Sequence, residues 1–561
     1  MDLDKVVFDK IKKMEAEKGI EILLSILITS NSSDWEKRAK AIDLLIYFED
    51  TTHFQEIKNT YLNETYSVLK IKMGELLSHC YQNEGIEFLI TQYKQEKDWK
   101  VRNNIIEMVG KGDKKKIIPF FVEALGDPNV ECKTTAISSL GKLSATEAFL
   151  PLIELLQLRN EEIYNVLINT IVKIGKKEDL QKIIEHIHIP IGNLNVRKSI
   201  PIIIGKIGDK KSVDLLMELL DDENSIVRKN TVEAIEKIVD PNDLDKIKYL
   251  IEALNDDDID VRKATIKGLG NIGNENAIKP LTEFLKDKDK DIRKFTVKAL
   301  HKLLIKSGTY DIVYFLLKSR NQIEKREAIK LLGMIEDPNA ISILINLLNS
   351  SNAKVRNLAY KAILKISKDE INDLVLKTLE DKSWQIRKFS AKIIGKIGGA
   401  HALEPLFALI NDEDSRVRAA TIDALSRFDA NQVINLAKKS LENLDWKVRR
   451  TAVKLLIKIG SEESIKPLIS YVNDDDVFIK SWVAMALGKL TDIEDIEPII
   501  ALLKDQDSKI RISAAKALAQ IGDKQALEPL INTLGDDDYD VRKEIENALN
   551  QIDPNWMSEL E

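Results

Sequence analysis

A short pattern recurs along almost the whole chain at a spacing close to 31 residues. The pentapeptide DWKVR stands at 98–102 and again at 445–449, and aligning the chain on its Arg extends the pattern in both directions. The 504 residues from 38 to 542 contain 16 steps, a mean of 31.5, and every step after Lys325 is 31. Such self-similarity predicts a solenoid in which each unit packs mainly on its neighbours. The position of the Arg, called here the Arg slot, is occupied by Arg38, Lys70, Arg102, Lys133, Tyr164, Arg197, Arg228, Arg262, Arg293, Lys325, Arg356, Arg387, Arg418, Arg449, Lys480, Arg511 and Arg542.

The sequence of each repeat predicts two helices joined by a charged turn. In the unit 277–304, residues Ala277 to Leu285 have helical apolar spacing, and the apolar residues from Ile292 to Leu300 predict a second helix. A residue able to cap a helix N-terminus recurs four positions before the Arg slot; examples are Asp34, Asp98, Asn129, Asn224, Asp258, Asp289, Asp414, Asp445, Asp476, Asp507 and Asp538. Proline falls early in the first helix, where its missing N–H costs least, at Pro119, Pro151, Pro280, Pro405, Pro467, Pro498 and Pro529.

The full unit is clearest in ALEPLFALINDEDSRVRAATIDALSRF at 402–428. This pattern resembles HEAT repeats, in the short form found in phycobilisome-lyase-type proteins, over nearly the whole chain. The resemblance implies an all-α fold, an α-α superhelix of about 17 helix pairs, with the second helices on the concave side. We expect an N-terminal capping helix at 1–18, a HEAT-repeat solenoid at 19–555 and a C-terminal tail at 556–561. Repeats up to about 205 are degenerate and later ones regular, and EHIHIPIGN at 185–193 is expected to disrupt its helix.

The recurring Arg has two interpretations. It can form a row of ligand-binding cations. Alternatively it has a structural role, because an Asp usually precedes it by six or four residues, as Asp256 and Asp258 precede Arg262. Such an Arg can bridge its own turn or the turn of its neighbour, and we favour this interpretation.

Positions one, five and nine after the Arg slot are unusually basic. They lie within one sector of the second helix, and 26 of the 51 are Lys or Arg, against 84 of 561 in the whole chain. The acidic residues gather instead in turns such as NDDDID at 255–260. This pattern predicts a basic strip that binds an anionic ligand, although helix-dipole preference and a solvated surface explain part of it. The candidate concave surface, called here the lysine stripe, consists of Lys198, Lys229, Lys263, Lys267, Lys294, Lys298, Lys302, Lys330, Lys361, Lys365, Lys388, Lys392, Lys396, Arg450, Lys454 and Lys458.

Four of the six tryptophans share one register, three residues before the Arg slot: Trp35, Trp99, Trp384 and Trp446. Each ring can fill a gap over the neighbouring turn. The alternative is an edge hot spot for a partner, a role in which Trp is enriched.

Two HEAT-like enzyme families offer a test for catalysis. One resembles deoxyhypusine hydroxylase and binds two irons through His-Glu pairs, but Glu follows none of the histidines here, which are His53, His79, His186, His188, His301 and His401. The other excises alkylated DNA bases with an acidic residue in a basic cleft, and no residue of this chain is singled out for that role. The segment GKGDKKK at 110–116 lacks P-loop spacing. We therefore predict no catalytic residues, no metal site and no cofactor, and expect a protein that is not an enzyme.

Composition places the chain in a broad class. Net charge is −7, which predicts no polyanion partner from bulk charge alone. Two cysteines, Cys80 and Cys132, fit a reducing compartment. The acidic N-terminus resembles no signal peptide, and no apolar run approaches the ~18 residues of a membrane span. We expect a cytoplasmic protein away from membranes, with a monomer as the default state.

Three functions remain open from the sequence. The leading hypothesis is a non-catalytic scaffold or adaptor that binds a protein partner along the concave surface, through an acidic segment of that partner. The alternative is a nucleic-acid-binding solenoid that contacts phosphates through the same stripe. The third is an enzyme, or an enzyme-associated HEAT protein of the lyase or oxidoreductase type.

Overall fold

The computed structural model describes residues 3–29, 34–157, 161–180, 193–208, 210–367, 373–489 and 495–559. All regular structure within these ranges is helical, as predicted. The segment 185–192 with His186 and His188, where a disrupted helix is expected, lies outside the described residues.

Every Arg slot is the fourth residue of a second helix, so the register read from the sequence is confirmed throughout. The second helices are α3 (Trp35–Tyr47), α5 (Ser67–Cys80), α7 (Trp99–Val109), α9 (Val130–Leu143), α11 (Glu161–Ile174), α13 (Leu194–Ile207), α15 (Ser225–Ile238), α17 (Ile259–Ile272), α19 (Lys290–Ser307), α21 (Gln322–Ile335), α23 (Ala353–Ile366), α25 (Trp384–Ile397), α27 (Ser415–Leu425), α29 (Trp446–Ile459), α31 (Val477–Leu487), α33 (Ser508–Ile521) and α35 (Tyr539–Ile552).

The helices that precede them are shorter in most of the later repeats, although α28 has 12 residues. In the unit 277–304 the first element is helical as predicted, but it is α-helical only over Ile278–Thr282 and continues as a 3-10 turn at Glu283–Lys286. The N-terminal helix is α1 (Leu3–Ile11), and the first helices are α2 (Ala16–Thr29), α4 (Phe54–Asn63), α6 (Gln82–Tyr93), α8 (Lys114–Ala124), α10 (Phe149–Leu155), α14 (Val213–Leu219), α16 (Leu244–Glu252), α18 (Ile278–Thr282), α20 (Asp311–Leu316), α22 (Ile341–Leu347), α24 (Asp373–Lys377), α26 (Leu403–Ala408), α28 (Ala430–Leu441), α30 (Glu462–Ile465), α32 (Glu497–Ala501) and α34 (Leu527–Ile531).

Caps start the second helices where the sequence predicts them. The side chain of Asp258 accepts hydrogen bonds from the backbone N–H groups of Asp260 and Val261, at 2.8 and 3.2 Å, which satisfies amides that have no partner inside the helix. Asp476 and Asp538 act in the same way. Asp34 is an exception, because its side chain makes no capping bond.

Glycine eight residues after the Arg slot lets successive second helices approach closely. A Cβ atom added to Gly270 would lie 2.7 Å from the Cα atom of Ala299, and one added to Gly395 would lie 2.6 Å from the Cα atom of Ala424. The recurring Gly is therefore a packing residue inside the helix. A different glycine ends α17: Gly273 has φ of 79°, the left-handed conformation typical of helix C-caps.

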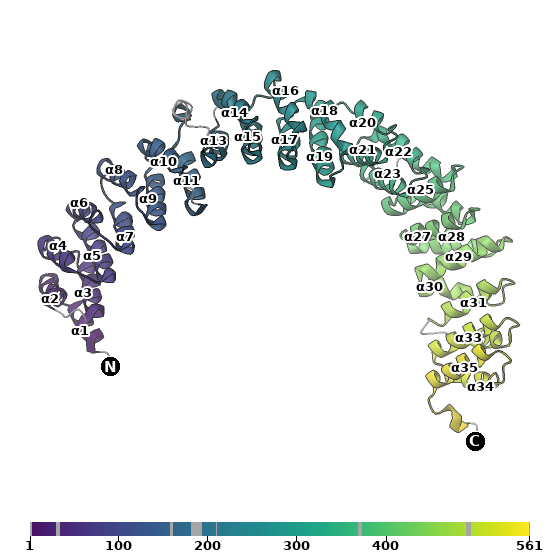
Figure 1. Ribbon diagram of the computed structural model, residues 1–561. Coiled ribbons are helices and arrows are strands. Elements are labelled where there is room, and N and C mark those ends of the chain that lie inside the picture. Colours follow the sequence, from purple (N-terminus) through teal and green to yellow (C-terminus); the bar gives the residue numbers. More distant parts are fainter. Residues whose placement is uncertain are drawn as a thin grey trace. The chain divides into compact units, whose positions relative to one another are not determined.

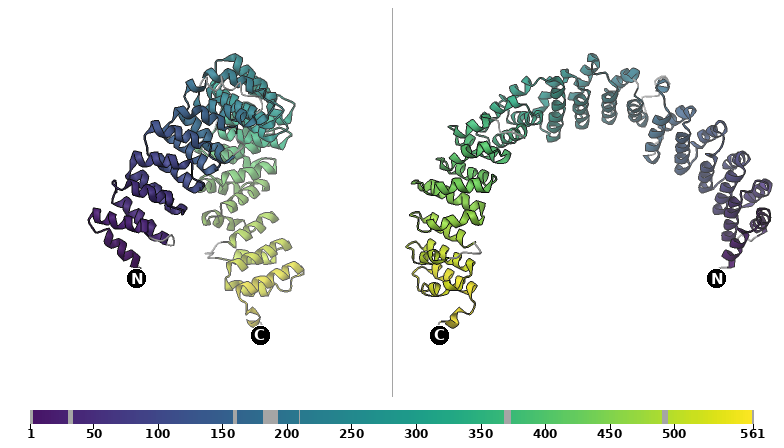
Figure 2. Two further views of the ribbon diagram at one scale, coloured as in Figure 1. Left: turned by 60° about the vertical axis from the view of Figure 1, so that its left-hand side comes forward. Right: turned by 180° about the vertical axis from the view of Figure 1, so that it is seen from behind.

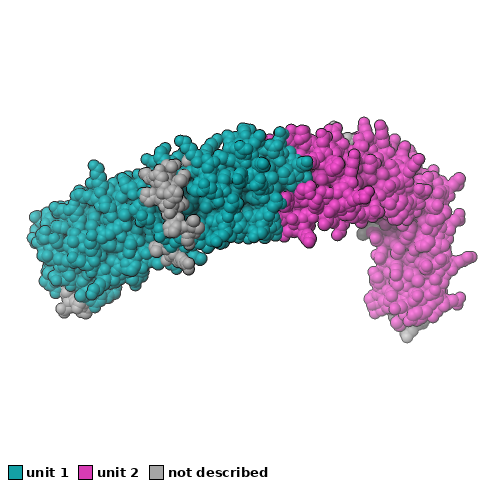
Figure 3. All heavy atoms as spheres, turned by 45° about the horizontal axis from the view of Figure 1, so that its top comes forward, with its two compact units in different colours: residues 1–282, 294–303 teal, residues 283–293, 304–561 magenta. Residues whose placement is uncertain are grey.

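The chain forms two compact units, and Figure 3 distinguishes them. Unit 1 consists of Met1–Thr282 and Lys294–Leu303, and unit 2 of Glu283–Arg293 and Leu304–Glu561. Within unit 1 the second helices form one layer and the first helices the other, with the second helices on the concave side (Figures 1 and 2). Neighbouring second helices contact each other, as α13, α15 and α17 do in unit 1 and α29, α31 and α33 do in unit 2. The apolar core lies between the layers.

Candidate binding surface on the second helices

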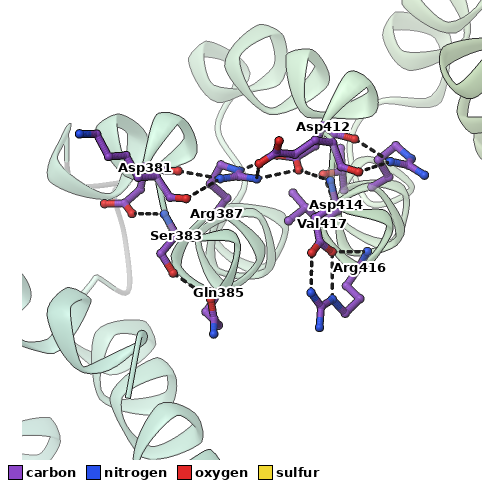
Figure 4. Close-up of polar contacts among 12 residues, drawn as sticks. Asp381, Ser383, Gln385, Arg387, Asp412, Asp414, Arg416 and Val417 are labelled. Carbon is purple, nitrogen blue, oxygen red and sulfur yellow. Dashed lines mark hydrogen bonds and ion pairs between the residues drawn. The ribbon is translucent and has the colours of Figure 1, made fainter. Parts of the chain in front are cut away.

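Several arginines of the Arg slot connect adjacent repeats, whereas others, such as Arg262 and Arg418, bond to the turn of their own repeat. Arg387 donates from Nη1 to the carbonyl oxygens of Asp381 and Lys382, at 2.9 and 3.1 Å, in the turn of its own repeat. Its Nε and Nη2 donate to the two carboxylate oxygens of Asp412 in the next turn, at 2.6 and 2.9 Å (Figure 4). Because Asp412 also accepts the backbone N–H of Asp414 at 2.8 Å, one carboxylate joins two repeats and shapes a turn.

The same arrangement repeats along both units, and we call it the turn ladder. In each case the carboxylate belongs to the turn of the following repeat; the pairs are Arg102–Asp127, Arg197–Asp222, Arg228–Asp256, Arg387–Asp412, Arg449–Asp474 and Arg511–Asp536. The hydrogen bond from Arg511 is the main cause that lowers the pKa of Asp536, and that carboxylate in turn raises the pKa of Arg511. These contacts support the structural interpretation of the recurring Arg.

In unit 1 the lysine stripe lies on α13, α15, α17 and α19. Lys198, Lys229 and Lys263 are half-buried, whereas the stripe residues that follow them are exposed. Lys302 donates to the side-chain oxygen of Asn271. Within the described residues no carboxylate lies within ion-pairing distance of the other members, which are Lys198, Lys229, Lys263, Lys267, Lys294 and Lys298.

In unit 2, α25 and α29 each contribute three residues to the stripe, and those of α25 are Lys388, Lys392 and Lys396. Burial is the largest cause that lowers the pKa of Lys388, and the like charges of Lys392 and Arg416 lower it further. Lys392 and Lys396 are exposed and line a cavity of about 200 Å³ with Tyr360, Arg427 and Asp423. Three cations therefore line this cavity against one carboxylate, that of Asp423.

Other stripe members of unit 2 do have acidic partners. Lys330 lies 2.7 Å from Glu327, Lys458 lies 3.6 Å from Asp423, and Arg450 lies 2.7 Å from Asp476. Asp423 stands in the stripe sector of α27 and interrupts the run of cations between α25 and α29. Lys361 and Lys365 are exposed on α23, with no ion pair to any described residue.

The four tryptophans of the shared register are only partly covered. Trp35, Trp99 and Trp446 are 41%, 39% and 44% exposed. The ring of Trp384 is half-buried, with the guanidinium carbon of Arg416 3.3 Å from its centroid. The rings of Trp99, Trp384 and Trp446 therefore contact cations, and each of the four rings leaves part of its surface open to solvent.

Sequence reasoning missed an aromatic cluster beside the stripe. Lys454 Nζ lies 4.4 Å from the ring centroid of Trp482. Phe478 lies 5.8 Å from Trp482, centroid to centroid, on the same helix α31. The cluster was missed because these rings stand two residues on either side of the Lys480 slot, outside the three positions considered, and reach the stripe from the next repeat. The run FIKSW at 478–482 was the signal.

Other candidate chemistry is sparse in the part of the chain that the structure describes. No group of three or more His, Cys, Asp or Glu residues is placed to hold a metal ion there. Both cysteines are buried, and burial is the main cause that raises the pKa of Cys80 to about 11 and of Cys132 to about 12. Neither thiol is therefore activated as a nucleophile. No described helix has both the length and the apolarity that crossing a membrane requires.

Comparison with known families agrees with this architecture. The model of HEAT repeats matches residues 86–168, 192–249, 247–309, 371–443, 436–505 and 496–555, and that of the PBS lyase HEAT-like repeat matches 324–350. The chain belongs to the HEAT-repeat family. The resemblance seen in the sequence is thus confirmed for this HEAT-repeat protein.

Solved structures similar to the HEAT-repeat protein are long helical-repeat proteins. One is the karyopherin Kap121p bound to the extreme C-terminus of the phosphatase Cdc14p, with 11% identity, 97% of this chain and 88% of that chain covered, and a TM-score of 0.37. Another is UNC-45 from Drosophila melanogaster, with 10% identity, coverage of 97% and 95%, and a TM-score of 0.32. No curated protein matches the sequence.

Proposed function

We propose that this HEAT-repeat protein is a non-catalytic adaptor that binds an acidic segment of a protein partner along the lysine stripe. The observation that carries the proposal is a contrast within single helices. Arg387 of the turn ladder is neutralised by Asp412, whereas burial lowers the pKa of Lys388, the next residue, and the like charges of Lys392 and Arg416 lower it further. Concentrated positive charge of this kind destabilises the free protein, and an acidic ligand would relieve the repulsion.

Geometry supports a long ligand. The stripe residues stand on second helices that follow one another in each unit, with a break at α27 in unit 2, so their charges recur along the solenoid. Complementary charge of this kind favours fast and selective association with an oppositely charged partner. Solenoids of this class offer extended surfaces for such binding.

Nucleic acid is the second candidate, and the aromatic cluster of α31 is the observation that favours it. Single strands bind to surfaces where bases stack on aromatic rings beside cations. The acidic turns, such as 255–260, oppose a polyanion at the edge of the same surface. If the stripe binds phosphates, the affinity for nucleic acid should fall steeply as the salt concentration rises.

The first experiment is purification of the tagged full-length protein from its own host, with and without nuclease, followed by identification of what accompanies it. Protein partners that remain after nuclease support the adaptor. Partners that disappear, with nucleic acid recovered from the untreated sample, would overturn it.

Charge reversal then tests the surface. The stripe variant carries Glu at Lys263, Lys267, Lys294 and Lys298, and its control carries Glu at four exposed lysines of first helices, Lys114, Lys115, Lys248 and Lys279. Both variants change net charge equally. Since exposed pairs contribute about 0.2–1 kcal/mol each, the stripe variant should bind the recovered partner about tenfold more weakly or worse, and the control should bind almost normally. Equal weakening of both would reject the stripe as the site.

A further inference from the structure

A groove crosses three second helices of unit 2, beside the aromatic cluster. It has a volume of about 340 Å³, near the lower end of the roughly 300–1,000 Å³ typical of ligand pockets. Helices α29, α31 and α33 supply its walls, and its lining residues are Lys454, Ile457, Trp482, Met485, Ala486, Lys489, Lys516 and Gln520.

The floor of the groove is apolar and its rim is cationic. Trp482, Met485 and Ile457 form the floor, and Met485 is 39% exposed although it is a large apolar residue. Three lysines surround this floor. Lys516 lies 3.7 Å from Glu544, whereas Lys454 and Lys489 are exposed and form no ion pair with any residue that the structure describes.

The aromatic wall is held in place by its neighbours. The guanidinium carbon of Arg450 lies 4.2 Å from the ring centroids of both Trp446 and Phe478, and Asp476 accepts hydrogen bonds from Arg450 Nε at 2.8 and 2.9 Å. Arg450 is therefore neutralised and lies behind the wall, where it holds Phe478, which packs against the lining residue Trp482. A wall fixed in this way loses little conformational entropy when a ligand binds.

We propose that this groove receives one large apolar side chain of an acidic protein segment, whose neighbouring carboxylates pair with Lys454 and Lys489. The inference rests on the proposed adaptor function and names the point where that segment would be anchored. Charge complementarity selects an acidic ligand, since the rim has two cations without carboxylate partners. The exposed Met485 selects an apolar side chain, because its flexible thioether adapts to irregular apolar shapes.

A stacked nucleobase fits this groove less well. Lys454 already lies over the face of Trp482 at 4.4 Å, and Phe478 packs against the same ring at a tilt of 46°. A base would have to displace one of these groups in order to stack. An apolar side chain needs only the floor around Met485 and Ile457, which is open.

The test uses the full-length protein and three labelled synthetic peptides in a fluorescence anisotropy titration. The first contains glutamate and serine with one central phenylalanine, the second has serine in place of the phenylalanine, and the third has glutamine in place of every glutamate. Burial of the phenylalanine should make the first peptide bind about 10- to 100-fold more tightly than the second. The third peptide should bind much more weakly than the first.

Variants then locate the binding. Met485→Glu should abolish the preference for phenylalanine. Its control, Leu444→Glu, changes a fully exposed residue in the turn before α29 and should keep that preference. The double variant Lys454→Gln with Lys489→Gln is a second test, because it leaves the apolar floor intact. It should lower the affinity for the first peptide, while the circular dichroism spectrum and the thermal midpoint stay unchanged. If Met485→Glu and Leu444→Glu keep the same preference, or if the first two peptides bind wild type equally, the groove inference is overturned.

The outcomes separate this inference from the adaptor proposal. If both acidic peptides bind equally and the unit 1 stripe variant weakens them, the adaptor surface stands and only the groove is rejected. If neither acidic peptide binds, and the recovered partner binds the stripe variant as tightly as wild type, the adaptor proposal fails and the groove inference fails with it. A single-stranded oligonucleotide that binds more tightly than the first peptide, and loses affinity with Met485→Glu, would overturn the groove as a protein site.

Discussion

Arg387 and Lys388 are neighbours on one helix and carry the same charge, yet they belong to two different regions of unit 2. Arg387 lies in the turn ladder, where its side chain is 9% exposed and that of its partner Asp412 is 3% exposed. Lys388 lies in the lysine stripe, where burial and nearby cations lower its pKa. The turn ladder uses positive charge to connect repeats, and the lysine stripe leaves positive charge available to a ligand.

This difference teaches that the number of charges on a solenoid says little about binding. A guanidinium that bridges two turns is unavailable to a ligand, and removing it should affect stability. A lysine without a carboxylate partner adds little to stability, and removing it should affect binding. Four measurements test that separation, beginning with the largest expected effect.

Asp412→Ala should produce the largest loss of stability. The change leaves the guanidinium of Arg387 without its partner at a poorly exposed site, and breaking a buried ion pair costs about 3–5 kcal/mol. Urea denaturation followed by circular dichroism measures the loss. Asp423→Ala is the matched control, because Asp423 is 64% exposed and pairs at 3.6 Å with Lys458, so its removal should cost about 1 kcal/mol or less. Similar small losses for both would show that the turn ladder does not stabilise the repeats.

Gly395→Ala should destabilise the protein by about 1–3 kcal/mol, because the added methyl group would clash with Ala424 on the next helix. This change tests whether helix packing, rather than the turns, sets the spacing of the stripe. Gly268→Ala is the control, since its methyl group would meet only ordinary contacts of 3.6 Å or more. There the better helix propensity of Ala should stabilise by about 1 kcal/mol, so the two changes should move the urea midpoint in opposite directions.

Acid should weaken the turn ladder before it affects the stripe. The hydrogen bond from Arg511 lowers the pKa of Asp536 below its ordinary value of 3.8, so its stabilising contribution is fully present above pH 3.8 and is lost as pH falls through the folded-state pKa. Asp536→Asn should be less stable at neutral pH and should show a flatter loss of stability below pH 3.8. Urea midpoints across a pH series measure this slope. The exposed neighbour Asp537 provides the control variant Asp537→Asn, and an identical slope in both variants would argue against the Arg511 contact.

Lys388→Met should have the smallest effect on stability, and its sign should be positive. The folded-state pKa of Lys388 lies below its ordinary value of 10.5, so the protonated lysine destabilises the folded protein at neutral pH. That cost disappears as pH rises through the folded-state pKa toward 10.5. The thermal midpoint of the variant should exceed that of wild type slightly at pH 7, and the gap should close in alkaline buffer. Arg387→Met, one residue away, should instead be clearly destabilised, and a loss of the same size in both would remove the distinction between the two regions.

Much of the fold followed from the sequence because its signals are local. The register of every second helix, the capping residues and the basic sector depend on residues within one repeat. The extent of the first helices was less predictable. At Glu283–Lys286 the α-helix gives way to a 3-10 turn, and this change leaves the apolar spacing in the sequence almost unchanged. The Arg slot was correctly interpreted as structural, but the sequence left open whether it contacts its own turn or the next.

The tertiary structure decided which charges are neutralised and which remain. Arg387 and Asp412 are 25 residues apart, and Lys454 reaches Trp482 from a neighbouring helix. These contacts depend on how one repeat stacks on the next, a geometry set by close approaches such as that of Gly395 to Ala424. The sequence by itself determined the repeat, the helical class and the sector that contains the lysines, because periodicity along one helix is enough for each. Only the stacking of helices brought an apolar floor and aromatic rings to that sector, since side chains from three repeats meet there.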